Sequence, residues 1–187
     1  MAKKPVQVDV YSDYACPYCF LAEQPLQSAV QSLRDQKIGV DVNWKPFELR
    51  PRPNPTLKPE EDYLQGAWKN GVYPAAQRMG VPIKLPSVSP QPYTDLAFEG
   101  AQYAKEHGKA DNYNHQVFVS FFQNDEDIGN LEVLTNIARR IGLDADDFAA
   151  ALQSHKGASA LGIHLVPTFL LRGSGQARQV SGVLPMQ

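Results

Sequence analysis

The chain has 187 residues, 43% of them hydrophobic and 20% charged, which suffices for one domain with a substantial core and a sizeable insertion. A formal net charge of −2 gives no electrostatic reason to expect nucleic acid or an anionic membrane as a partner. No apolar run is long enough to span a bilayer, and no apolar signal core follows the two N-terminal lysines. We therefore expect a cytoplasmic protein.

The first expected elements surround the only two cysteines of the chain. Alternating valines predict a strand over residues 6–11, and a short turn over residues 12–15 follows it. Cys16 and Cys19 then open a segment in which apolar residues recur at helical spacing up to Leu33. A Cys-x-x-Cys between a strand and a helix is typical of thiol–disulfide chemistry.

The order of residues predicts different roles for the two thiols. Pro17 suits the first turn of a helix, where its missing N–H is not needed, and this places Cys16 at the helix N-terminus. Unpaired backbone N–H groups and the helix dipole stabilise a thiolate there. We expect Cys16 to be the attacking and leaving sulfur. Cys19, one turn further along and less exposed, is expected to be the resolving thiol.

The cysteine pair has three other interpretations. A structural disulfide is disfavoured because so short a loop gives little entropic stabilisation. Half of a zinc site would need two further ligands, and the four histidines show no paired spacing. Inert thiols are the remaining alternative. We expect no metal and a redox-active pair.

The next segments predict a βαβ unit followed by helices. Residues 38–45 alternate as a second strand, which a right-handed connection makes parallel to the first. A proline-dense stretch over residues 46–92 leaves the sheet and contains short helical pieces. Further helices are then expected, with an aromatic stripe that we assign to a core and with Thr94, Asn130 and Asp144 as N-caps. The expected helices cover residues 60–70, 74–79, 94–107, 110–123 and 131–141, with one more after residue 144.

Strand-forming residues return near the end of the chain. Residues 162–181 predict a β-hairpin, and Pro167 stands where a strand tolerates proline, at its start. The fold class expected is α/β, with the sheet interrupted by helices. The expected divisions are an N-terminal part over residues 1–50, a helical insertion over 51–155, and a C-terminal part over 156–187.

Several motifs together resemble a known family. The chain looks like a thioredoxin fold with a large all-helical insertion, as in the DsbA family, and most like its FrnE-like branch. The resemblance covers nearly the whole chain. It rests on the segments 13–21, 44–49, 121–122, 127–129, 141–144 and 166–169, the last of which reads Val-Pro-Thr-Phe.

The resemblance implies a third part of the site, distant in sequence. Pro167 is expected to be cis and to pack against the cysteine pair, where it blocks metal capture and leaves the backbone of Val166 free for an extended substrate. Pro17, Tyr18 and Thr168 complete the expected substrate contacts. Two departures from the family are a short link over residues 152–157 and a chain that stops where the last helix of the fold would begin.

These features predict a protein-disulfide oxidoreductase that works through a mixed disulfide. The substrate is expected to be a thiol- or disulfide-containing protein or small molecule, without a cofactor but with glutathione as a possible co-substrate; the oligomeric state stays open. Asp13 is a candidate for tuning Cys16 or for acid–base work, or it belongs to the turn before the helix.

Two alternatives remain for the function. One is a glutathione-dependent enzyme of the same fold, similar to 2-hydroxychromene-2-carboxylate isomerase or the kappa-class transferases, which have serine in the position of Cys16 and lack the second cysteine. The other is a metal- or thiol-binding adaptor that uses both cysteines and a histidine such as His164.

Overall fold

The computed structural model describes residues 5–154, 167–172 and 178–181, apart from the side chains of residues 168 and 181. Two compact units make up the chain. One combines Met1–Phe47 with Ala160–Gln187, and the other is Glu48–Ser159. None of the helices in the described part is both long enough and apolar enough to cross a bilayer.

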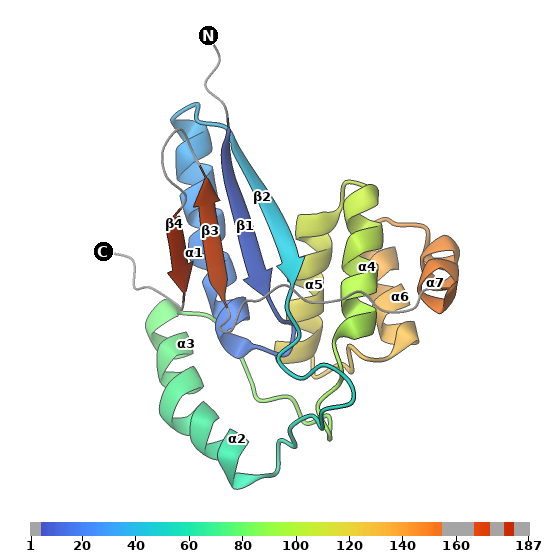
Figure 1. The fold of residues 1–187 in the computed structure, drawn as a ribbon. Helices are drawn as coiled ribbons and strands as arrows, with labels where there is room; N and C mark the ends of the chain where they lie inside the picture. Colours follow the sequence, from blue (N-terminus) through green and yellow to red (C-terminus); the bar gives the residue numbers. More distant parts are fainter. Residues whose placement is uncertain (1–4, 155–166, 173–177, 182–187) are drawn as a thin grey trace. The chain divides into compact units, whose positions relative to one another are not determined.

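The first unit is a mixed four-stranded sheet with one long helix (Figure 1). The strand order is β2-β1-β3-β4, in which β1 runs parallel to β2 and antiparallel to β3, and β4 is antiparallel to β3. The predicted βαβ unit and C-terminal hairpin are therefore confirmed. The elements are β1 (Val6–Ser12), α1 (Pro17–Asp35), β2 (Val40–Pro46), β3 (Thr168–Arg172) and β4 (Arg178–Ser181).

The two faces of β1 differ in chemistry, as the alternation predicts. Val8 and Val10 form a buried apolar cluster with Val30 of α1 and Val40 of β2. On the opposite face, the Asp9 carboxylate binds Arg172 Nη1 at 2.8 Å and accepts a hydrogen bond from Asn43 Nδ2 at 3.2 Å. This polar contact ties β1 to both of its neighbours in the sheet. Residues 162–166, which we also expected in a strand, lie outside the described residues.

The second unit is helical, as predicted for the insertion. Its helices are α2 (Asp62–Ala67), α3 (Tyr73–Met79), α4 (Asp95–Glu106), α5 (Ala110–Phe122), α6 (Leu131–Arg140) and α7 (Ala145–Ser154).

The two short helices expected at the start of this unit are continuous with each other. A π-helical turn, Trp68–Val72, joins α2 to α3, and the N–H of Tyr73 donates to the carbonyl of Trp68. Pro74 has no N–H to donate back along the helix, which favours a wide turn over a regular one. Helical spacing was therefore predicted correctly on both sides of the proline, but the break between them was wrong.

The core of the helical unit is aromatic. Tyr113, Phe118, Phe121 and Phe122 of α5 are fully buried, together with Phe148 of α7. This confirms that the predicted stripe on α5 belongs to a core. The core also depends on a glycine in α4, because a Cβ at Gly100 would clash with Tyr113 and Phe148.

Two of the three predicted N-caps are confirmed. The Asn130 side chain accepts the N–H of Glu132 at 2.8 Å, and Asp144 Oδ1 accepts the N–H groups of Asp146 and Asp147 at 3.0 and 2.9 Å. Thr94 makes no side-chain capping bond, so that prediction was wrong. Its backbone, at φ −104° and ψ 0°, lacks the extended conformation from which a cap side chain reaches the first turn.

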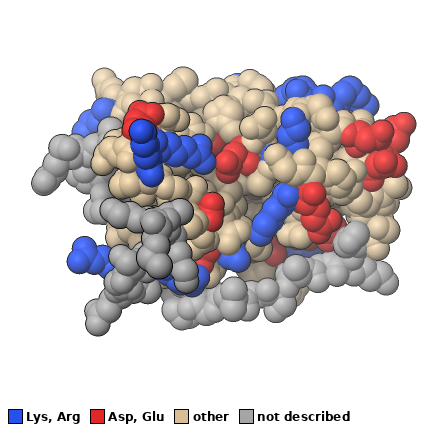
Figure 2. Space-filling model, turned by 90° about the horizontal axis from the view of Figure 1, so that it is seen from above, with Lys and Arg blue, Asp and Glu red and all other residues tan. Residues whose placement is uncertain are grey.

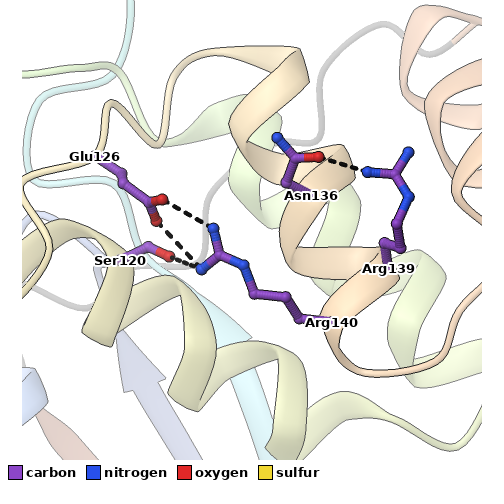
Figure 3. A network of polar contacts seen from close by, with 5 residues as sticks. All are labelled: Ser120, Glu126, Asn136, Arg139 and Arg140. Atoms are coloured by element: carbon purple, nitrogen blue, oxygen red, sulfur yellow. Dashed lines mark hydrogen bonds and ion pairs between the residues drawn. The ribbon is translucent and has the colours of Figure 1, made fainter.

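A polar network links α5, the loop after it and α6 (Figure 3). Arg140 Nη2 binds Glu126 Oε1 at 2.8 Å, and Arg140 Nη1 donates to Ser120 Oγ at 3.4 Å. The hydrogen bond from Arg140 holds the pKa of Glu126 below its ordinary value. Basic and acidic side chains are interspersed over the described part of the face in Figure 2, which matches the small net charge.

Candidate active site

The candidate site is built on the turn between β1 and α1. Cys16 is the N-cap of α1, with an extended backbone at φ −92° and ψ 109°, and Pro17 follows in the first turn. The N–H of Cys16 donates to the carbonyl of Asp13 at 3.1 Å, which closes the turn. The N–H of Cys19 donates to the carbonyl of Cys16 at 3.0 Å. The sequence thus places both cysteines in the first turn of α1, as predicted.

The two cysteines are free thiols and lie next to each other. Cys16 is 4% exposed and Cys19 is 2% exposed, so Cys19 is the less exposed of the two by only this small margin. Burial raises the pKa of Cys19 well above its ordinary value, and the hydrogen bond to Cys16 and its charge raise it further. Cys19 is consequently a protonated thiol at neutral pH.

Two groups, one at the end of β1 and one in the turn after it, act on the pKa of Cys19 in the opposite direction. The backbone N–H of Asp13 and the hydroxyl of Ser12 lie close to its sulfur, and both lower the pKa of Cys19. Ser12 was missed by the sequence reasoning. A signal was present, because Ser12 continues the face of β1 that carries Val8 and Val10 and looks toward α1. A polar residue at the end of this apolar face points toward the start of α1, where Cys19 lies.

Asp13 is almost completely buried, and its Oδ1 accepts the N–H of Ala15 at 3.2 Å. This contact is that of a turn residue before a helix, one of the interpretations left open for it. Its influence on Cys16 stays a prediction. Tyr18, between the cysteines, is 36% exposed, and Pro17 is half-buried. The motif therefore presents an aromatic ring to solvent while its sulfurs are covered.

The start of β3 lies next to the end of β1 from which the cysteine turn leaves. In the antiparallel pairing of β1 with β3, Tyr11 lies opposite Thr168. Pro167, which is buried, comes directly before Thr168 in the chain, and Ser12 comes directly after Tyr11. Val166, the bond that joins it to Pro167, and the side chain of Thr168 lie outside the described residues, so the cis bond and the substrate contacts stay predictions.

Within the described ranges, no group of three His, Cys, Asp or Glu side chains is placed to hold a metal ion. His107 stacks on Tyr103 with ring centroids 4.1 Å apart, which occupies it within the helical unit. His164, the histidine named for an adaptor, lies outside the described residues, as does the link over residues 155–157.

Taken together, the fold and this turn define a class of protein: a thioredoxin-type sheet with a cysteine pair opening its first helix and a helical unit inserted before its C-terminal hairpin. The model of the DSBA-like thioredoxin domain matches residues 7–186. The chain therefore belongs to the family of DSBA-like thioredoxin domains.

The chain is 46% identical over 150 residues to the uncharacterized protein YwbO of Bacillus subtilis (strain 168), an alignment that covers 80% of this chain and 72% of YwbO.

Among solved structures, it resembles a probable DsbA oxidoreductase of Streptomyces coelicolor, SCO1869, with a TM-score of 0.75 and 21% identity over 96% of this chain and 85% of that one. It also resembles the cytosolic disulfide reductase DsbM of Pseudomonas aeruginosa with GSH, with a TM-score of 0.67 and 14% identity over 94% and 89% of the two chains.

Proposed function

We propose that this protein is a thiol–disulfide oxidoreductase in which Cys16 and Cys19 alternate between a dithiol and a disulfide. The observation that carries the proposal is the pair of adjacent free thiols at the start of α1, of which Cys19 has a raised pKa. A pair in which one thiol is held protonated while the other sits at a helix N-terminus can react in a fixed order. Membership of the DSBA-like family supports the same activity.

The proposed reaction has two exchange steps when a substrate disulfide is reduced. The Cys16 thiolate attacks one sulfur of the substrate, the substrate S–S bond breaks, and one substrate sulfur leaves as a thiolate. Cys19 then attacks Cys16 Sγ, which breaks the mixed disulfide and releases the second substrate sulfur. Two electrons pass from the cysteine pair to the substrate, and the thiol protons go to the released thiolates through solvent. The reverse sequence oxidises a dithiol.

The other proposed roles follow the site geometry. Tyr18 is exposed beside the buried thiols, so we assign it, with Pro17, to the substrate surface. Pro167 and Thr168 stand at the adjacent end of β3, and we assign them the same role together with the backbone of Val166. Asp13 is assigned to tuning the pair. We place the protein in the FrnE-like branch and in the cytoplasm, where a lone cysteine pair stays available for chemistry.

The proposed substrates are thiol- or disulfide-containing proteins or small molecules. Glutathione is proposed as a co-substrate, because a disulfide reductase of the same fold has been solved with GSH. No other cofactor is proposed, since thiol–disulfide exchange needs only the two sulfurs and a substrate.

The test is reduction of insulin disulfides by the full chain with glutathione as the electron donor. We expect Cys16→Ser to abolish turnover, and Cys19→Ser, mixed with insulin in the absence of glutathione, to stop at a mixed disulfide that mass spectrometry detects. Ser28→Ala, on the exposed side of α1, is the matched control and should react as the wild type does. Unchanged turnover in Cys16→Ser would refute the proposal. Glutathione-dependent conversion of a small molecule that contains no disulfide, if it survives Cys19→Ala, would instead favour an isomerase or transferase.

A further inference from the structure

We propose that the Ser12 hydroxyl and the backbone N–H of Asp13 form a binding site for the thiolate of Cys19, and that Ser12 acts on the resolving cysteine whenever its sulfur carries negative charge. This inference rests on the proposed exchange activity and adds a residue to it. The site belongs wholly to the end of β1 and the turn that follows.

The backbone of Ser12 is fixed on both sides. It is the last residue of β1 and lies opposite Pro46 in the parallel pairing with β2. Its carbonyl accepts the N–H of Phe47 at 3.1 Å. One residue later, the carbonyl of Asp13 accepts the N–H of Cys16. The hydroxyl of Ser12 and the N–H of Asp13 are therefore held by the sheet and by the turn, and neither needs to move to meet a charge on the sulfur.

The Ser12 hydroxyl is buried, and no described group makes a hydrogen bond with it. It lies beside Cys19 Sγ without completing a hydrogen bond while that sulfur is a protonated thiol engaged with Cys16. A buried hydroxyl without a partner is costly, and native proteins seldom keep one without a use. A thiolate at Cys19 supplies the missing acceptor.

The exchange reaction needs a hydrogen-bond donor beside Cys19 in two steps, one in each direction. When a substrate thiolate attacks Cys16 in the oxidised pair, the Cys16–Cys19 bond breaks and its electrons go to Cys19, which leaves as a thiolate in a buried place. In the opposite direction, Cys19 loses its proton to solvent and attacks Cys16 Sγ of the mixed disulfide, so that the substrate sulfur leaves with the electrons of the broken bond. A donor held beside Cys19 stabilises the charged sulfur in both directions.

Few of the groups around Cys19 can stabilise its thiolate. Of the described residues, Cys16 is the titratable side chain that acts on Cys19, and it disfavours the thiolate. Asp13 acts on Cys19 through its backbone N–H. The Ser12 hydroxyl is thus the one side chain in the described part of the chain that favours the thiolate.

The test follows the two releases from an aromatic disulfide reagent, such as Ellman's reagent, added in one equivalent to the reduced protein. Cys16 releases the first coloured thiolate as it forms a mixed disulfide, and Cys19 releases the second as it attacks Cys16. Because Cys16 is then in a disulfide and no longer titrates, the pH dependence of the second release reports Cys19.

The expected effect of Ser12→Ala follows from the loss of one hydrogen bond to a charged group. Such a loss shifts the titration of Cys19 upward by about one to two pH units. The smaller thiolate fraction is partly offset by the greater nucleophilicity of a more basic thiolate. The second release should therefore become about three- to tenfold slower at neutral pH. Ser12→Thr, which keeps the hydroxyl, should restore most of the rate, and Ser28→Ala should leave it unchanged.

A purely structural role for Ser12 predicts something different. Ser12→Ala would then lower the melting temperature of the reduced protein and leave the pH profile of the second release in place. We expect the opposite, because the variant removes a hydroxyl that has no partner in the reduced state: an equal or higher melting temperature together with a shifted profile. An unshifted profile in folded Ser12→Ala overturns the inference, whatever Ser12→Thr does.

The same samples separate this inference from the proposed function. If Cys16 releases no first thiolate, the exchange activity fails. Cys19 is then titrated directly by the ultraviolet absorbance of its thiolate in Cys16→Ser, with and without Ser12→Ala. A higher midpoint without the hydroxyl supports the thiolate site, and an equal midpoint overturns it.

Discussion

Among the glycines that the structure describes, Gly100 of α4 leaves the least room for a Cβ, because Tyr113 of α5 and Phe148 of α7 pack against it. A Cβ at this position would stand 2.7 Å from Tyr113 Cζ and 2.8 Å from Phe148 Cζ, and closer still to the Tyr113 hydroxyl. Both aromatic side chains are fully buried, so neither can turn outward to make room. We predict that Gly100→Ala destabilises the protein although alanine is the better helix former.

The expected change in the free energy of unfolding of Gly100→Ala is the sum of two opposing effects. Forcing a methyl group into a filled core costs about 1–3 kcal/mol, and here two rings must shift, which favours the upper part of that range or beyond it. Replacing glycine by alanine inside a helix returns about 1 kcal/mol. A net loss of about 1–2 kcal/mol remains, which corresponds to a decrease in Tm of about 2–8 °C for a protein of this size.

Gly66 is the matched control, because it also lies in a helix, α2, but a Cβ there meets no described atom within 4 Å. Gly66→Ala should stabilise the protein by about 0.5–1 kcal/mol. Tyr113→Phe removes the Tyr113 hydroxyl oxygen, which is the atom closest to the new methyl group. This hydroxyl has no hydrogen-bond partner among the described residues. In the double variant with Gly100→Ala it should recover part of the loss. Thermal and urea unfolding of the wild type and the four variants measure these terms, and a Gly100→Ala protein as stable as Gly66→Ala would refute the packing argument.

Two further predictions concern the ends of helices and one ion pair. Removing the N-cap in Asn130→Ala or Asp144→Ala should cost about 0.5–2 kcal/mol in urea unfolding, whereas Thr94→Val, which removes no capping bond, should cost less. Glu126 has a lowered pKa because Arg140 binds it, so its contribution is present above the ordinary glutamate pKa and is lost as pH falls through the lower pKa of the folded state. The stability difference between wild type and Glu126→Gln should be below about 1 kcal/mol at neutral pH, since both side chains are partly exposed, and should vanish in acid. A difference that grows in acid would contradict this assignment.

The parts of the fold that could be predicted from the sequence are those with strong local periodicity. The valines of β1 and the aromatic stripe of α5 each show which face is buried, because one side of a strand or helix must meet the core. The break expected near Pro74 was wrong because a π-turn accommodates the missing donor. The cap expected at Thr94 was wrong because capping depends on a backbone conformation that residue type alone does not set.

The candidate site also has features that could be predicted from the sequence and features that could not. Cys16 and Cys19 could be placed from their spacing and from Pro17, since the first turn of a helix brings i and i+3 together. The strong burial of both sulfurs could not be predicted, because it depends on how β1, the turn and α1 fit together. Ser12 was missed because serine at a strand end is common. Its alternation with Val8 and Val10 was the signal in the sequence, and its missing partner beside Cys19 makes it distinctive in the structure.

The central place of β1 in the sheet has a consequence for the order of events during synthesis. Its Tyr11 pairs with Lys45 of β2 on one side and with Thr168 of β3 on the other, across a stretch of chain four to five times longer. Closing the longer loop costs about 1–1.5 kcal/mol more if the intervening chain is flexible. A ribosome therefore releases the cysteine turn long before the strand that completes the sheet beside it. Until β3 docks, the two thiols belong to a half-formed sheet, and we expect their exchange with thiols of other molecules to be least selective during that interval.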